Sequence, residues 1–155
     1  MLATLKQVLD KANRGQYAVG AFNVNNLEIL QAVVAAAEET KSPVICQTSE
    51  GALEYAGMDY LLAMMQVAAK KASVPIVIHL DHGKDLDVIK KAIESGYTSV
   101  MIDASALPYT DNIKKVKQVV AWAKKKGVSV EAELGALAGI EDKVNVADFD
   151  AVLSC

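Results

Sequence analysis

The two histidines of the chain lie in the stretch IVIHLDHG, residues 76–83, on either side of Asp81. A neutral imidazole at the end of a buried strand is a good zinc ligand, and a carboxylate beside it can carry a proton. In a straight strand Asp81 and His82 would face opposite sides, so both reach one site only if the chain turns at His82. Gly83 makes such a turn favourable, because glycine adopts backbone conformations that other residues avoid. His79 lies deeper in the strand and is interpreted as a buried histidine with a hydrogen-bond partner.

Carboxylates end the next two apolar segments. Asp103 and Glu133 could be metal ligands or substrate contacts, or alternatively a salt bridge or the cap of a following helix. Glu131 lies two residues before Glu133 on the same strand face and is interpreted as a structural partner. The segment GALAGIEDK, residues 135–143, has small residues followed by acidic ones, which is typical of a mobile loop. Its Glu141 is a candidate general base, and Asp142 is the other residue there that could act as one.

Three neutral polar residues complete the set of candidate site residues. Asn23, Gln47 and Ser49 lie at the ends of the first two apolar segments. Their side chains offer hydrogen bonds suited to a hydroxylated or phosphorylated substrate. From the residues alone we therefore predict a metalloenzyme that acts on sugars or phosphates.

The elements that must position these residues alternate along the chain. Apolar segments predict five strands, at residues 17–24, 43–49, 75–83, 99–105 and 128–135. Apolar residues at helical spacing predict an opening helix that ends at Gly15 and one helix after each of the first four strands. We expect Gly96 to cap the third of these helices, and Thr110 and Gly127 to begin and end the fourth.

The order of these elements predicts an α/β fold. Near-continuous apolar strands are typical of a parallel sheet covered on both faces, either an open doubly wound sheet or a TIM (β/α)8 barrel. One polar residue ends each strand, and only a barrel aims all such residues at one centre. No glycine-rich dinucleotide loop follows the first strand. Since a barrel needs about 250 residues, we predict that residues 1–155 are a single partial domain, strands one to five of eight, truncated at the C-terminus.

Composition narrows the classes of partner. The chain is 52% apolar and 23% charged with a net charge of −3, which indicates a globular protein without a surface for nucleic acid. No apolar run approaches the length of a membrane span, and the N-terminus lacks the features of a signal peptide. Two cysteines, Cys46 and Cys155, cannot form a disulfide framework, so we expect a cytoplasmic protein.

Five motifs together carry a family resemblance: AFNVNN, PVICQTS, HLDHG, MIDAS and VEAELG. With these motifs the chain resembles the N-terminal part of class II, zinc-dependent fructose-bisphosphate aldolases and their close relatives, the tagatose-bisphosphate aldolases. The pair HLDHG and VEAELG is the most specific. The resemblance implies a TIM barrel and the reversible aldol cleavage of a ketose bisphosphate to dihydroxyacetone phosphate and glyceraldehyde 3-phosphate. It also implies a homo-oligomer when the protein is full length.

The resemblance assigns catalytic and metal-binding roles to residues that match the motifs. His82 matches a catalytic zinc ligand, and Asp103 and Glu133 match the position of a second divalent cation. Asp81 matches the acid that protonates the C4 hydroxyl oxygen. Glu141 falls where the family has a loop glutamate involved in proton abstraction, although the sequence AGIED differs from the commonest form of that loop.

The resemblance also places the substrate. Ser49 matches a residue that binds the substrate phosphate, and Asn23 and Gln47 line the same pocket. Fructose and tagatose bisphosphates differ only in stereochemistry at C4, which the motifs do not distinguish.

Alternatives remain because the family draws two further histidine ligands from later strands, and no histidine follows His82 here. The chain could be part of an aldolase, an inactive half-barrel that serves as a structural or interaction module, or part of another barrel enzyme such as a sugar-phosphate isomerase. In every case we expect residues 1–155 alone to be inactive as an aldolase.

Overall fold

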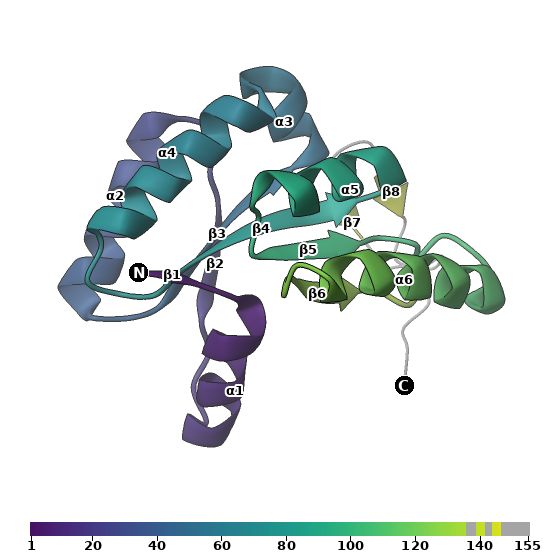
Figure 1. Ribbon diagram of the computed structural model, residues 1–155, viewed down its shortest axis with the longest axis horizontal. Coiled ribbons are helices and arrows are strands. Elements are labelled where there is room, and N and C mark those ends of the chain that lie inside the picture. The colour runs from purple at the N-terminus through teal and green to yellow at the C-terminus, as the bar shows by residue number, and fades with distance from the viewer. Residues whose placement is uncertain (136–138, 142–143, 147–155) are drawn as a thin grey trace.

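Five parallel strands pair in the order in which they occur along the chain (Figure 1). The computed structural model describes the backbone of residues 1–135, 139–141 and 144–146, and the side chains of residues 1–135. The strands of the sheet are β2 (Gly20–Asn23), β3 (Val44–Ser49), β4 (Ile76–Gly83), β5 (Ser99–Ile102) and β6 (Ser129–Ala132). The short strand β1 (Leu2–Ala3) pairs with the start of β4, and β7 (Gly139–Glu141) pairs with β8 (Val144–Val146) in a separate antiparallel hairpin.

Helices connect the strands and cover what we call the outer face of the sheet (Figure 1). They are α2 (Leu27–Thr40), α3 (Glu50–Ala56), α4 (Met58–Lys71), α5 (Leu86–Ser95) and α6 (Tyr109–Lys124). No helix within the described ranges is both long enough and apolar enough to cross a lipid bilayer. The sequential parallel order with helices on the outer side confirms the predicted α/β fold, that of a partial barrel rather than a doubly wound sheet.

The main hydrophobic core lies between the outer face and these helices. Alternate residues of β4 point into it, and the side chains of Ile76, Ile78 and Leu80 are fully buried. The residues between them along the strand point to the opposite face of the sheet, which we call the inner face. That face carries the polar side chains of Gln47 and His79, which pair in register across β3 and β4.

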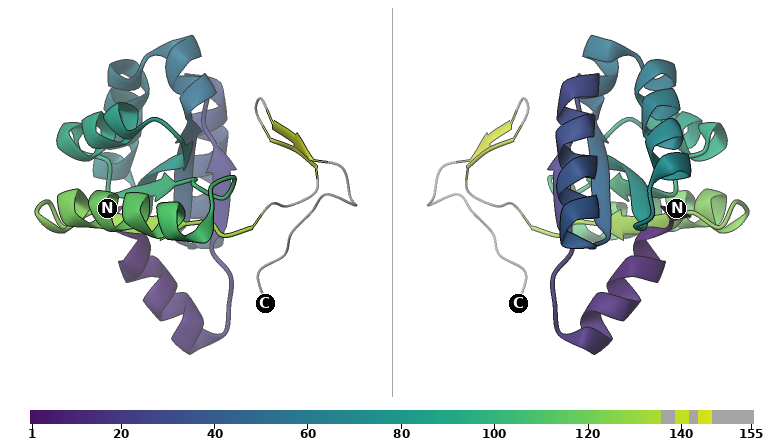
Figure 2. Two further views of the ribbon diagram at one scale, coloured as in Figure 1. Left: turned by 90° about the vertical axis from the view of Figure 1, so that its right-hand side faces the viewer. Right: turned by 90° about the vertical axis from the view of Figure 1, so that its left-hand side faces the viewer.

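Helix α1 (Leu5–Gly15) packs against the inner face (Figure 2). Thr4 begins the helix with a capping box, in which its hydroxyl accepts from the Gln7 backbone N–H. Its apolar residues Leu5 and Val8 pack on Ile45 and Val77, at the amino-terminal end of the sheet. The carboxyl-terminal end of the same face is left for polar residues.

Three local features differ from the predictions, and one of them is the end of α6, which lies at Lys124 rather than at Gly127. Helix α3 was not predicted; it starts immediately after β3, and the Ser49 hydroxyl caps it by accepting from the Ala52 N–H at 3.3 Å. Thr110 does not cap α6, because the helix already begins at Tyr109 after Pro108. Pro108 itself has an extended backbone, with ψ 143°, and is the N-cap, so the helix starts directly after it. The predicted cap at Gly96 is confirmed, since this residue ends α5 in the left-handed region.

The chain turns at His82, as predicted, but Gly83 is not the residue that turns. His82 itself has φ 45°, and the pairing of β4 with β5 shifts register between Leu80 and Gly83. Such a bulge redirects a side chain at the end of a strand. Gly83 is required for close packing instead, because a Cβ atom there would lie 2.6 Å from the backbone oxygen of Met101 and 2.8 Å from Cγ1 of Ile89.

We therefore expect the Gly83→Ala variant to be less stable than wild type by roughly 1–3 kcal/mol, the usual effect of overpacking a buried site. Urea denaturation measures the change. Gly51→Ala is the control, because this glycine lies exposed in α3 and alanine favours a helix. Equal stabilities of the Gly83→Ala variant and wild type would contradict the packing argument.

Candidate active site

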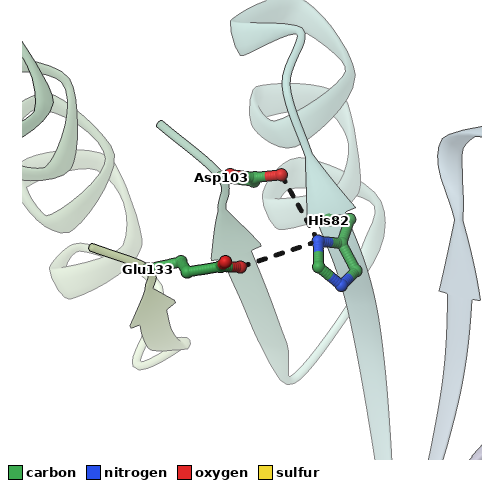
Figure 3. Close-up of side chains that lie close together, drawn as sticks. All are labelled: His82, Asp103 and Glu133. Atoms are coloured by element: carbon green, nitrogen blue, oxygen red, sulfur yellow. Dashed lines mark hydrogen bonds and ion pairs between the residues drawn. The ribbon is translucent and has the colours of Figure 1, made fainter. Parts of the chain in front are cut away.

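Three predicted metal ligands meet at the carboxyl-terminal ends of neighbouring strands (Figure 3). His82 lies in the bulged end of β4, while Asp103 and Glu133 follow β5 and β6 directly. His82 Nδ1 is 3.3 Å from Asp103 Oδ2 and 3.9 Å from Glu133 Oε2. One ligand atom from each residue lies within 4.8 Å of the other two, so a single small cation could contact all three.

The donor set of this cluster suits a divalent transition metal. It combines one imidazole nitrogen with two carboxylates, and zinc accepts both kinds of ligand. Calcium and magnesium prefer oxygen ligands alone, so the imidazole favours a softer cation. The residues present therefore fit zinc.

Asp103 is held as an ionised and oriented carboxylate. Burial by itself raises the pKa of this carboxyl, but hydrogen bonds from Ser105 and His82 and the charge of Lys84 outweigh burial and lower the pKa. The Ser105 hydroxyl and backbone N–H donate to Oδ1 at 2.6 and 3.1 Å. Oδ2 faces His82, with Lys84 Nζ at 3.7 Å. One oxygen is therefore held by Ser105 and the other is directed at the cluster.

A buried asparagine that the sequence analysis did not single out ties two ligands together through the backbone. Asn112, in the first turn of α6, donates to the Ala104 carbonyl at 3.0 Å and to the Glu133 carbonyl at 2.8 Å. These carbonyls belong to the segments that follow β5 and β6. The bonds fix the spacing of Asp103 and Glu133, which no local sequence signal reveals, because Asn112 reaches across to the following strand.

A second polar group lies beside the cluster on the inner face. Gln47 Nε2 donates to Asp81 Oδ2 at 2.7 Å and to Asn23 Oδ1 at 3.0 Å. The three residues come from neighbouring strands, which brings together residues that are far apart in the sequence. Ser49 is the last residue of β3, two residues after Gln47 and in register with Asp81 of β4. Its hydroxyl, however, is directed at the start of α3, where it accepts from the Ala52 N–H.

His79 is a neutral, buried histidine beneath these groups. Its Nδ1 is 2.9 Å from the Ser99 hydroxyl, and its Nε2 is 3.5 Å from Glu131 Oε2 and 4.0 Å from Asp81 Oδ1. Burial, and then the charge of His82, lower the pKa of His79 to about 4. The prediction of a buried histidine with a partner is confirmed, and Glu131 lies where a structural partner would. Burial, followed by the charge of Asp81, raises the pKa of Glu131.

Glu141 ends strand β7, and its side chain lies outside the described residues. Its role as a general base stays a prediction.

Comparison with known proteins gives consistent similarities. Residues 3–153 match the model of the family described as fructose-bisphosphate aldolase class-II. The chain is 52% identical over 144 residues to the fructose-bisphosphate aldolase of Giardia intestinalis, covering 92% of this chain and 45% of that protein. It is 49% identical over 154 residues to the enzyme of the same name from Thermus caldophilus, covering 99% of this chain and 50% of that protein.

Solved structures agree with the sequence comparison. The YdjI aldolase from Escherichia coli K12 superposes with a TM-score of 0.84 at 40% identity, covering 87% of this chain and 53% of that one. The fructose-bisphosphate aldolase from Campylobacter jejuni superposes with a TM-score of 0.75 at 26% identity, covering 87% of this chain and 48% of that one. The chain thus spans about half the length of the relatives it matches.

The neutral state of His79 predicts a pH-dependent stability. The folded pKa, about 4, lies below the ordinary value of 6.5. The unfolded chain therefore binds the proton more readily, and stability falls as pH drops from 6.5 towards 4, by up to roughly 3 kcal/mol.

Urea denaturation of the metal-free protein at pH 7 and pH 4, for wild type and His79→Asn, measures this contribution. Asparagine places a polar atom near the position of Nδ1 but does not titrate. We expect the variant to lose less stability than wild type between the two pH values. Equal losses would show that His79 is not held neutral by burial.

Proposed function

The chain belongs to the class-II fructose-bisphosphate aldolase family, and from that premise we propose that it forms the N-terminal part of a zinc-dependent aldolase. The reaction is the reversible cleavage of fructose 1,6-bisphosphate to dihydroxyacetone phosphate and glyceraldehyde 3-phosphate. The observation that supports it most is the cluster of His82, Asp103 and Glu133, whose ligand atoms lie within 4.8 Å of one another. Membership of this family also favours an aldolase over a sugar-phosphate isomerase.

The metal roles that we propose are those implied by the family resemblance, and the donor set is compatible with them. We assign His82 to the catalytic zinc, and Asp103 and Glu133 to a second divalent cation in the same cluster. When bound, zinc supplies a Lewis acid that polarises the ketose carbonyl and so weakens the bond between C3 and C4. Asn112 and Ser105 act indirectly, since their hydrogen bonds hold the segment of Glu133 and the carboxylate of Asp103.

Asp81 is proposed to move the proton of the C4 hydroxyl. In the cleavage direction its carboxylate accepts this proton as the C3–C4 bond breaks, and in condensation it returns the proton to the C4 oxygen. The hydrogen bond from Gln47 keeps Asp81 in an acceptor role. Glu141 is proposed for the other proton transfer, as the family resemblance implies.

Neutral side chains are proposed to bind the substrate. The Ser49 hydroxyl accepts from the Ala52 N–H, which leaves its own proton for a phosphate oxygen. Asn23 is exposed at the end of β2, where its amide can meet a substrate oxygen. Because tagatose bisphosphate differs only at C4, the activity assay should include both sugars.

We further propose that the full-length enzyme is a cytoplasmic homo-oligomer. Cys46 is a free, buried cysteine, and the low cysteine content of the chain is what favours a reducing compartment. No nucleic acid or membrane is expected as a partner.

Neighbouring substitutions test the proposal in the full-length protein. We expect Asp81→Ala to lower cleavage at least about 100-fold while leaving zinc bound, because it removes a proton carrier. His82→Ala should lose zinc affinity and activity together, because it removes a ligand. A coupled assay for triose phosphate and metal analysis after dialysis measure both effects. Full activity of Asp81→Ala would remove this residue from the mechanism, and absence of zinc-dependent cleavage in wild type would refute the proposed function.

Residues 1–155 alone should show no cleavage with zinc added. With Asp103 and Glu133 assigned to the second cation, His82 is the one described residue left for the catalytic zinc, whereas a catalytic zinc site needs about three protein ligands. Among the described strands, β2 and β6 each have one neighbour in the sheet, so two edges can pair with other chains. We expect the isolated piece to self-associate, which light scattering detects. Zinc-dependent turnover by a monodisperse monomer would contradict this expectation.

A further inference from the structure

We propose that Gln47 is a positioning residue, which sets the orientation of the Asp81 carboxylate and of the Asn23 amide. The family resemblance treats Gln47 as one of the residues that line the substrate pocket. The structure instead gives its amide two partners within the protein, both of them candidate site residues. This inference rests on the proposed aldolase function, because it concerns the same site.

Both N–H groups of the Gln47 amide are engaged. Nε2 donates to Asp81 Oδ2 at 2.7 Å and to Asn23 Oδ1 at 3.0 Å, and a primary amide nitrogen carries two protons. An ionised carboxylate only accepts hydrogen bonds, so the amide must present its nitrogen, not its oxygen, to Asp81. The chemistry of Asp81 thus decides which way the Gln47 amide is oriented.

The orientation of Gln47 decides that of Asn23. Because Gln47 donates to it, Asn23 must present its oxygen towards Gln47 and direct its NH2 group elsewhere. Asn23 is exposed at the carboxyl-terminal end of β2. It therefore offers a donor to the substrate, and a carbonyl, hydroxyl or phosphate oxygen is the group that it can bind.

The backbone supports this arrangement on both sides of Gln47. Asn23 and Gln47 are register partners in β2 and β3, and the Val24 N–H donates to the Gln47 carbonyl at 2.8 Å. Asp81 is the register partner of Ser49, two residues beyond Gln47 and on the same face of the sheet. The residue after Asp81 has a left-handed backbone, so the regular ladder ends at this point. The charge-assisted hydrogen bond from Gln47 helps to hold the carboxylate at this point.

Kinetics of the full-length protein separate positioning from substrate contact. We expect Gln47→Ala to lower kcat by about 10- to 100-fold, the usual result of misplacing a catalytic group. KM should rise no more than it does in Asn23→Ala, because Asn23 is misoriented rather than removed. Gln47→Glu has the same shape and should be at least as impaired, since its carboxylate would face the carboxylate of Asp81 and the oxygen of Asn23.

Thr48→Val is the matched control. Thr48 is the next residue of β3 and points to the outer face, where its hydroxyl lies 3.0 Å from the Tyr97 hydroxyl. Its loss should reduce stability and leave kcat and KM unchanged. A kcat loss in Gln47→Ala that Thr48→Val does not share cannot come from a general weakening of the strand.

Coupling with Asn23 is the second readout. If Gln47 orients Asn23, then Asn23→Ala should cost less activity in the Gln47→Ala background than in wild type. Raised KM at unchanged kcat would make Gln47 a substrate contact, and additive losses would mean that it does not orient Asn23. Either result overturns the proposal, as does a Gln47→Ala enzyme with wild-type kinetics.

Crystal structures separate this inference from the proposed function. In Gln47→Ala we expect the Asp81 carboxylate and the Asn23 amide to rotate from their wild-type positions, which requires no activity. Wild-type protein without zinc-dependent cleavage would refute the aldolase function while the rotations still supported positioning. Unchanged side chains in the variant would overturn the positioning role even in an active enzyme.

Discussion

The left-handed backbone of His82 is the constraint on which the candidate site depends. A side chain in this region typically costs of order 1–3 kcal/mol, and such residues persist only where their surroundings hold them. Here β5 holds the turn, because Gly83 packs against the Met101 carbonyl too closely for any side chain. The turn lets consecutive residues serve one site: Asp81 stays on the inner face with Gln47, while the imidazole of His82 swings towards Asp103. A regular strand would send one of them into the hydrophobic core.

Around this turn, hydrogen bonds and the charge of Lys84 hold the carboxylates. Serine and lysine side chains keep Asp103 ionised despite its burial, and an amide from Gln47 holds Asp81. His79 contributes through its neutrality: a protonated imidazole between Asp81 and Glu131 would compete with a metal cation for negative charge. Negatively charged carboxylates are what the metal and proton-transfer roles that we propose for them require.

The fold determines where the side chains at the strand ends lie, and the types of those residues determine which chemistry they can perform. Parallel strands in sequential order bring the carboxyl-terminal ends of β4, β5 and β6 side by side, and many unrelated reactions use such an arrangement. What distinguishes this chain is the type of residue at each end, and its similarity to class-II aldolases extends over residues 3–153. Because the chain spans about half of its relatives, the described ligands form one side of the site that we propose.

The sequence by itself determined the order and type of the main elements and the residues that end each strand. Apolar runs and helical periodicity are local signals, and five motifs, above all the pair HLDHG and VEAELG, indicated the family. Only the tertiary structure decided which side chains meet. The bond from Gln47 to Asp81, the link from Asn112 to Glu133 and the direction of the Ser49 hydroxyl depend on register between separate strands and on where a helix begins. Gly83 shows the same limit, since its neighbour Met101 comes from another strand, and local sequence carries no information about contacts across strands.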